Sequence, residues 1–169
     1  VFKKKYKFLY LWLGFMGIGA ASGVFFQYQV LIPALIDAFV VINKDAEIEN
    51  LLIEGCTIVG DGNKNSYGIY GQNPNATIKV KKCNFSNLGY AIQATAGGGY
   101  ENLTVEECTF EGMISWVIMP QYGSYAGDLT ITGCTFDNTK GGLIKSGALT
   151  ADHTFTFTNN VITNSTGHD

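Results

Sequence analysis

Cysteine is the residue type whose spacing in this sequence is regular enough to suggest chemistry. The intervals between the four cysteines are 27, 25 and 26 residues, at Cys56, Cys83, Cys108 and Cys134. A thiolate metal site needs ligands a few residues apart, as in C-x-x-C, and these intervals do not provide them. Two interpretations remain: disulfides between neighbours, as in many exported proteins, or a column of free thiols that behave as small apolar groups.

Acid–base hydrolysis would need paired carboxylates, but the acidic side chains are scattered, at Asp61, Asp128, Asp137 and Asp152. His153 and His168 each stand alone in turn-like sequence. The glycine-rich stretches 62–68 and 96–100 do not lead into a helix, as a phosphate-binding loop would. We therefore expect solvated turn residues here, with no catalytic residue, no metal and no other cofactor.

Aromatic side chains offer a different kind of site. Several lie in or beside the loops of the repeat described below, at Tyr70, Tyr100, Trp116, Tyr122 and Tyr125. Exposed rings can stack on the C–H faces of sugars, whereas buried rings would only shield the turns. The hypothesis for a ligand site is a glycan that stacks on Tyr100, Trp116, Tyr122 and Tyr125.

An internal repeat must position all of these residues. The octets "LTVEECTF" (103–110) and "LTITGCTF" (129–136) share the pattern L-x-I-x-x-C-x-F, and sliding this pattern along the chain gives five copies. The third anchors lie 25 to 27 residues apart: Cys56, Cys83, Cys108, Cys134 and, with Asn in the Cys place, Asn160. A fixed period of this length is the signature of a solenoid.

Each repeat contains about three short strands. Leu129 and Ile131 are two residues apart, as are Cys134 and Phe136, so each pair shares one face of a strand. The three-residue step between Ile131 and Cys134 predicts a bend at residues 132–133, where Gly and Asn tolerate positive φ. A second apolar cluster follows each octet, for example "YGIYG" (67–71) and "YAIQA" (90–94).

Such a unit is one rung of a parallel β-helix, in which equivalent side chains stack in ladders along the coil. The sequence resembles the repeats of right-handed single-stranded parallel β-helix proteins with a pectin-lyase-like fold, over about residues 40–169. We expect an all-β fold of about five rungs of 25–27 residues. Cys56, Cys83, Cys108, Cys134 and Asn160 then form a structural ladder, which favours reduced, inward-pointing thiols.

The family includes polysaccharide lyases, glycoside hydrolases, surface proteins and adhesins. Its pectate lyases use an Arg base and Asp-bound calcium, and this chain contains no Arg. The resemblance therefore favours a scaffold, a stalk or an adhesin that contacts a polysaccharide or a cell-surface glycan. The alternative is the N-terminal part of a polysaccharide lyase or glycoside hydrolase whose catalytic residues lie outside this sequence.

The N-terminus resembles a bacterial secretory leader. A basic start, "VFKKKYK", precedes an apolar stretch and small residues at 20–22, which is typical of a cleaved signal peptide. A retained anchor and a buried cap are the alternatives. We expect a leader at 1–23, an irregular first rung or cap at 24–46, and repeats at 47–169 that continue beyond the sequence.

The charge of the chain indicates its partners. The leader holds four of the eleven basic residues, which leaves seven lysines against fourteen acidic residues, a net charge of −7. An acidic body without basic clusters argues against nucleic acid as a partner. We expect a secreted or cell-surface protein that touches the membrane only if its leader is uncleaved.

Overall fold

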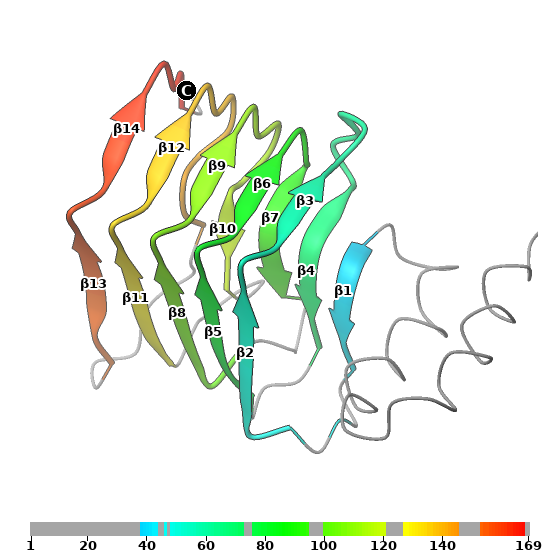
Figure 1. The fold of residues 1–169 in the computed structure, drawn as a ribbon, viewed down its shortest axis with the longest axis vertical. Coiled ribbons are helices and arrows are strands. Elements are labelled where there is room, and N and C mark those ends of the chain that lie inside the picture. The colour runs from blue at the N-terminus through cyan, green and yellow to red at the C-terminus, as the bar shows by residue number, and fades with distance from the viewer. Residues whose placement is uncertain are drawn as a thin grey trace, which may run out of the picture.

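The computed structural model describes residues 38–43, 46, 48–72, 76–94, 100–120, 127–145 and 153–167. In these ranges the chain forms fourteen β-strands and no helix, and all strands pair in parallel (Figure 1). Three sheets wind around one core. Sheet A contains β1 (Ala38–Ile42), β4 (Tyr67–Gly71), β7 (Tyr90–Ala94) and β10 (Ile118–Met119).

Sheets B and C contain the two halves of each octet. Sheet B consists of β2 (Asn50–Glu54), β5 (Thr77–Lys81), β8 (Asn102–Glu106), β11 (Asp128–Thr132) and β13 (Phe155–Thr158). Sheet C consists of β3 (Thr57–Val59), β6 (Asn84–Ser86), β9 (Thr109–Glu111), β12 (Thr135–Asp137) and β14 (Val161–Thr163). Each rung passes through sheet B, then C, then A, which gives about four complete turns.

The strand register confirms the repeat read from the sequence. Ladder partners in sheet B include Leu103 with Leu129 and Val105 with Ile131. The fifth copy continues the same ladders, because Phe155 and Phe157 pair with Leu129 and Ile131. Every rung therefore presents the same inward shapes to the next, as a solenoid requires.

The phenylalanine ladder of sheet C shows how these shapes stabilise the coil. Phe110 is fully buried and stacks on Phe85 at 5.3 Å on one side and on Phe136 at 5.0 Å on the other, with nearly parallel rings. Truncating a buried Phe to Ala typically costs about 3–5 kcal/mol. The ring stack is thus a main source of cohesion between rungs.

Left-handed backbone conformations make the bend between sheets B and C. Gly133 has φ +65° and Asn159 has φ +55°, at the step where the octet pattern predicts a bend. Lys82 and Glu107 adopt the same conformation at the equivalent positions, with φ +51° and +52°. Positive φ has a steric cost for residues with a side chain. Lys82 and Glu107 adopt it because their rung must bend at the same position as the rungs paired with it.

The irregular first rung predicted at 24–46 is described only in part. Residues 38–42 form β1, which pairs with β4 through Val40 and Ile69. This strand of sheet A comes before the first octet in the chain. The predicted leader at 1–23, and residues 24–37, lie outside the described residues.

Candidate functional site

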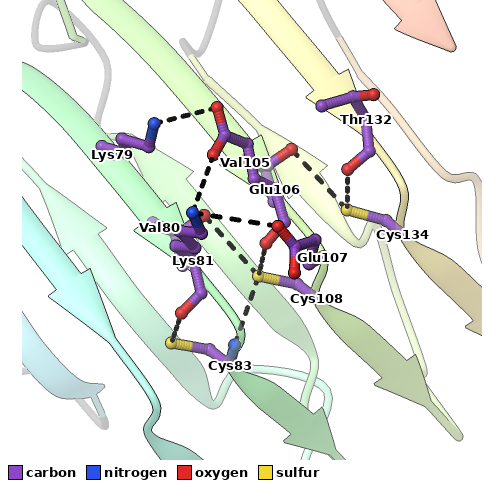
Figure 2. Close-up of polar contacts among 10 residues, drawn as sticks. All are labelled: Lys79, Val80, Lys81, Cys83, Val105, Glu106, Glu107, Cys108, Thr132 and Cys134. Carbon is purple, nitrogen blue, oxygen red and sulfur yellow. Dashed lines mark hydrogen bonds and ion pairs between the residues drawn. The ribbon is translucent and has the colours of Figure 1, made fainter.

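The cysteine ladder lies at the bend between sheets B and C (Figure 2). All four cysteines are free thiols; Cys56 is half-buried, whereas Cys83, Cys108 and Cys134 are buried. The sulfurs are not simply apolar. The Cys108 thiol donates to the carbonyls of Glu106 (3.2 Å) and Val80 (3.6 Å), and the N–H of Cys83 donates to the Cys108 sulfur (3.4 Å).

Asn160 makes the same pair of contacts with better hydrogen-bonding groups. Its Oδ1 accepts from the N–H of Cys134 at 2.8 Å, and its Nδ2 donates to the carbonyl of Ile131 at 3.0 Å. Parallel pairing is interrupted at the bend, so the backbone there needs side-chain partners. Cysteine and asparagine share this column because each supplies one acceptor and one donor to the preceding rung.

Burial and mutual contact set the acidity of the thiols. A hydrogen bond to the Cys134 side chain raises the pKa of Cys108, and burial raises it further. The same hydrogen bond lowers the pKa of Cys134. Burial also raises the pKa of Cys83. These contacts give the ladder a structural role and keep Cys83 and Cys108 in the protonated, unreactive form.

A cluster of charges lies near the ladder on the outer face of sheet B (Figure 2). Lys79 contacts Glu106 at 2.9 Å, and Lys81 contacts Glu106 and Glu107 at 3.8 Å each. All four side chains are partly or largely exposed. Pairs of this kind contribute little to stability, so we assign this cluster no function of its own.

Two of the scattered acidic side chains, Asp61 and Asp128, accept hydrogen bonds from backbone N–H groups. Asp61 accepts the N–H of Asn63 at 2.9 Å, and Asp128 accepts the N–H of Thr154 at 2.7 Å. Asp128 also lies 3.7 Å from Nδ1 of the exposed His153. Asp152 and His168 lie outside the described residues. Among the residues that the structure describes, no three His, Cys, Asp or Glu side chains are grouped to hold a metal.

Two hydrogen bonds from neighbouring side chains shift the acidity of Asp137. Its Oδ1 accepts hydrogen bonds from Thr163 at 2.7 Å and from Asn164 at 2.9 Å. These two bonds lower the pKa of Asp137, in that order of importance. A carboxylate held in its ionised form cannot serve as the general acid of a hydrolase, which needs a raised pKa.

Tyr100 does not belong to an exposed aromatic row, and that expectation is corrected. Tyr100 is 3% exposed, and its ring occupies the space beside Gly71, where an added Cβ would lie 2.4 Å from the ring. Its hydroxyl donates to the carbonyl of Gln93 at 2.9 Å. The ring packs at the coil because a glycine in β4 leaves room for it. Tyr122 and Tyr125 lie outside the described residues.

Trp116 is half-buried and stands just before β10. Its ring fills the space over Gly142 on the next rung, where an added Cβ would lie 2.0 Å away. The ammonium of the exposed Lys145 lies 5.4 Å from the ring centroid, a cation–π distance. Trp116 therefore combines a packed side with a side that reaches the surface.

Two other tyrosines occupy the same position of the two preceding rungs. Tyr67 pairs with Tyr90 in register, and their rings stack at 5.3 Å. Tyr70 contacts Tyr67 at 5.0 Å. The backbone of residues 115 and 117 pairs with Gly89 and Ala91, which places Trp116 level with Tyr90. We call Tyr67, Tyr70, Tyr90 and Trp116 the outer aromatic patch; all four are half-buried.

A local irregularity in sheet A turns Tyr67 and Tyr70 to the same side. Gly68 faces the core ring of Phe85, and the next residue, Ile69, is also fully buried. One rung on, the N–H groups of residues 91 and 92 both donate to the carbonyl of Val117. Two consecutive inward residues break the alternation of the strand, so residues three apart share the outer face.

The outer aromatic patch contains three residues that the sequence hypothesis left out of the site. The signal was present, because Tyr67, Tyr90 and Trp116 each precede the buried Ile of sheet A by two residues. Chemically, the patch offers ring edges and phenol groups from the stacked tyrosines and a larger apolar surface at Trp116. Such a surface can contact hydroxyl-bearing, partly apolar molecules.

Among the described residues, no helix is long and apolar enough to cross a bilayer. The leader predicted at 1–23 lies outside these residues.

Comparison with known proteins identifies the family. Residues 37–168 match the family described as "right handed beta helix region", which covers most of the chain. No curated protein and no solved structure matches the chain. Parallel sheets, in-register ladders and this match agree on one assignment. The chain belongs to the right-handed beta helix family.

Proposed function

We propose that this chain is an exported or cell-surface β-helix scaffold that contacts a neutral polysaccharide through the outer aromatic patch. The observation that carries the proposal is the recurrence of an aromatic side chain at one register position of three successive rungs, Tyr67, Tyr90 and Trp116. A linear polysaccharide is itself a repeating rod, so a row of contacts along the coil matches its form.

The chemistry of the patch supports a carbohydrate rather than a purely apolar ligand. The rings of Tyr67 and Tyr90 are stacked, and phenol groups of this kind can both donate and accept hydrogen bonds. Trp116 adds an apolar surface for the C–H face of a sugar. The net charge of −7 after the leader disfavours anionic glycans, so neutral sugars are favoured.

A rigid coil suits this role because the patch depends on the spacing between rungs. The inward ladders fix each rung against the next, and the same register sets the spacing of the patch residues. Each ring contributes little by itself, so affinity is expected to rise with the length of the glycan.

Binding to a glycan array, followed by titration of the best oligosaccharide, tests the proposal. Trp116→Ala and Tyr90→Ala should each weaken binding several-fold, because each removes one contact of the row. Leu52→Ala is the control, since Leu52 is an apolar side chain of sheet B that is 56% exposed and lies outside the patch. Binding that both patch variants retain, or that the control loses equally, would contradict the proposed site.

Export is tested separately from binding. The full chain, expressed in a bacterium, should appear outside the cytoplasm, and N-terminal sequencing of the product should begin near residues 22–24. A version without residues 1–23 should stay in the cytoplasm. Equal distribution of the two versions would contradict export.

A further inference from the structure

Gln93 carries an acceptor that the folded chain leaves unused. Its side chain lies in β7 and is 8% exposed, and its Oε1 is buried without a hydrogen-bond partner. It is the single buried side-chain oxygen or nitrogen in this state among the residues that the structure describes. Buried polar groups are nearly always paired, and an unpaired one points to a partner that binds there. Exchanging the amide oxygen and nitrogen would bury a donor instead, which needs a partner equally.

The position of Gln93 connects it to the outer aromatic patch. It pairs in register with Tyr70 on one side and with Met119 on the other. Tyr70 contacts Tyr67 in the patch. Gln93 therefore lies in the same column of sheet A as Tyr70, beside the outer aromatic patch.

Among the described residues, two neighbours of Gln93 do not supply the missing donor. Met119 has only a thioether, which is a weak acceptor. The Tyr100 hydroxyl donates to the main-chain carbonyl of Gln93 at 2.9 Å instead of to its side chain. Glutamine has three rotatable side-chain bonds, so the amide can reorient, and the register partner of Gln93 on one side is Tyr70 of the patch.

We propose that Gln93 is a specificity-determining residue for the glycan, whose hydroxyl donates a hydrogen bond to the Gln93 carboxamide oxygen. This inference rests on the proposed function and deepens it. A buried acceptor selects a ligand that carries a hydroxyl donor, and it rejects a carboxylate, which has no proton to donate at neutral pH. The site thus favours a sugar that presents a free hydroxyl to Gln93 over an O-methylated sugar, and over a uronic acid that presents its carboxylate there.

Gln93→Met tests the assignment, because methionine keeps the length and removes the hydrogen bond. The probes are cellohexaose, mannohexaose, hexagalacturonate and the O-methylated form of whichever neutral hexasaccharide binds best. We expect Gln93→Met to bind that neutral hexasaccharide about fivefold to tenfold more weakly, as for one lost hydrogen bond. The preference for free over methylated hydroxyls should disappear. Gln72→Met, the same change at a half-buried residue just after β4, should leave both values unchanged.

Thermal unfolding of the free protein supplies a second readout that needs no glycan. Because the oxygen is unpaired in the free protein, Gln93→Met should keep or raise the Tm. A Tm below that of both the original chain and Gln72→Met would overturn the inference, since the carboxamide would then already be satisfied. Equal affinity and equal selectivity in Gln93→Met would also overturn it while leaving the proposed function intact. If the original chain binds none of the probes nor any array glycan, both proposals fall.

Discussion

The cysteine column makes a prediction that separates packing from hydrogen bonding. Cys108 is 1% exposed, and its sulfur is the acceptor for the N–H of Cys83 at 3.4 Å and a donor to the carbonyl of Val80 at 3.6 Å. If the thiol acts only as a small apolar group, Cys108→Val should be the mildest change. If it acts as a backbone partner, Cys108→Asn should be milder, because Asn160 makes equivalent contacts two places along the column.

The magnitude follows from the contact that is lost. Valine leaves the buried N–H of Cys83 without an acceptor, and an orphaned group of this kind costs about 1–3 kcal/mol. We take about 1.5 kcal/mol, at the lower end, because sulfur is a weak acceptor. Asparagine supplies both an oxygen and an amide N–H, and its slightly larger size offsets part of that gain. We therefore expect Cys108→Asn to remain within about 1 kcal/mol of the original chain.

Urea unfolding followed by circular dichroism measures the difference. With a slope of about 2 kcal/mol per molar urea, Cys108→Val should lower the unfolding midpoint by about 0.7 M. Thr109→Val is the control, since Thr109 lies next in the chain on the outer face of β9 and should change stability by less than about 0.5 kcal/mol. If valine matches the original chain while asparagine lowers the midpoint by more, the hydrogen-bonding role of the column is refuted.

Three further predictions concern the ladders and the outer turns. Titration with a thiol reagent and no reductant should find four thiols after unfolding and fewer in the folded chain, because three of the four are buried; finding none after unfolding would show disulfides. Ile131→Asp should lower the free energy of unfolding by about 4 kcal/mol or more, since a carboxylate would enter an apolar ladder, whereas Thr132→Val on the outer face should change it little. Coincident thermal melts of the two variants would contradict the assigned faces. Asp137 has a lowered pKa in the folded state, so its contribution to stability is complete above its ordinary pKa of 3.8 and is lost as the pH falls through the lowered value. Asp137→Asn should therefore flatten the pH dependence of the urea midpoint below pH 3.8. An unchanged profile would show that Asp137 does not cause this pH dependence.

The repeat and its ladders were predictable from the sequence because every rung meets the same physical requirement. A rung cannot bury its own apolar residues, so equivalent positions must match the rungs above and below. Five copies of one pattern therefore gave the strands of sheets B and C, the bend before each cysteine and the substitution of Asn160 for cysteine. The left-handed Lys82 and Glu107 were not predictable from residue type, because the stack imposes their conformation.

The polar role of the cysteines and the membership of the aromatic patch were decided only by the tertiary structure. A thiol in an apolar phase looks like a small hydrophobe until the N–H of the preceding rung is placed 3.4 Å from the sulfur. Tyr67 and Tyr70 share the outer face because Gly68 and Ile69 both turn inward. Strict alternation would have put the two tyrosines on opposite faces, so the sequence pattern alone could not bring them together. Tyr100 became a core residue for a similar reason, since the space that receives its ring is created by Gly71 on the preceding rung.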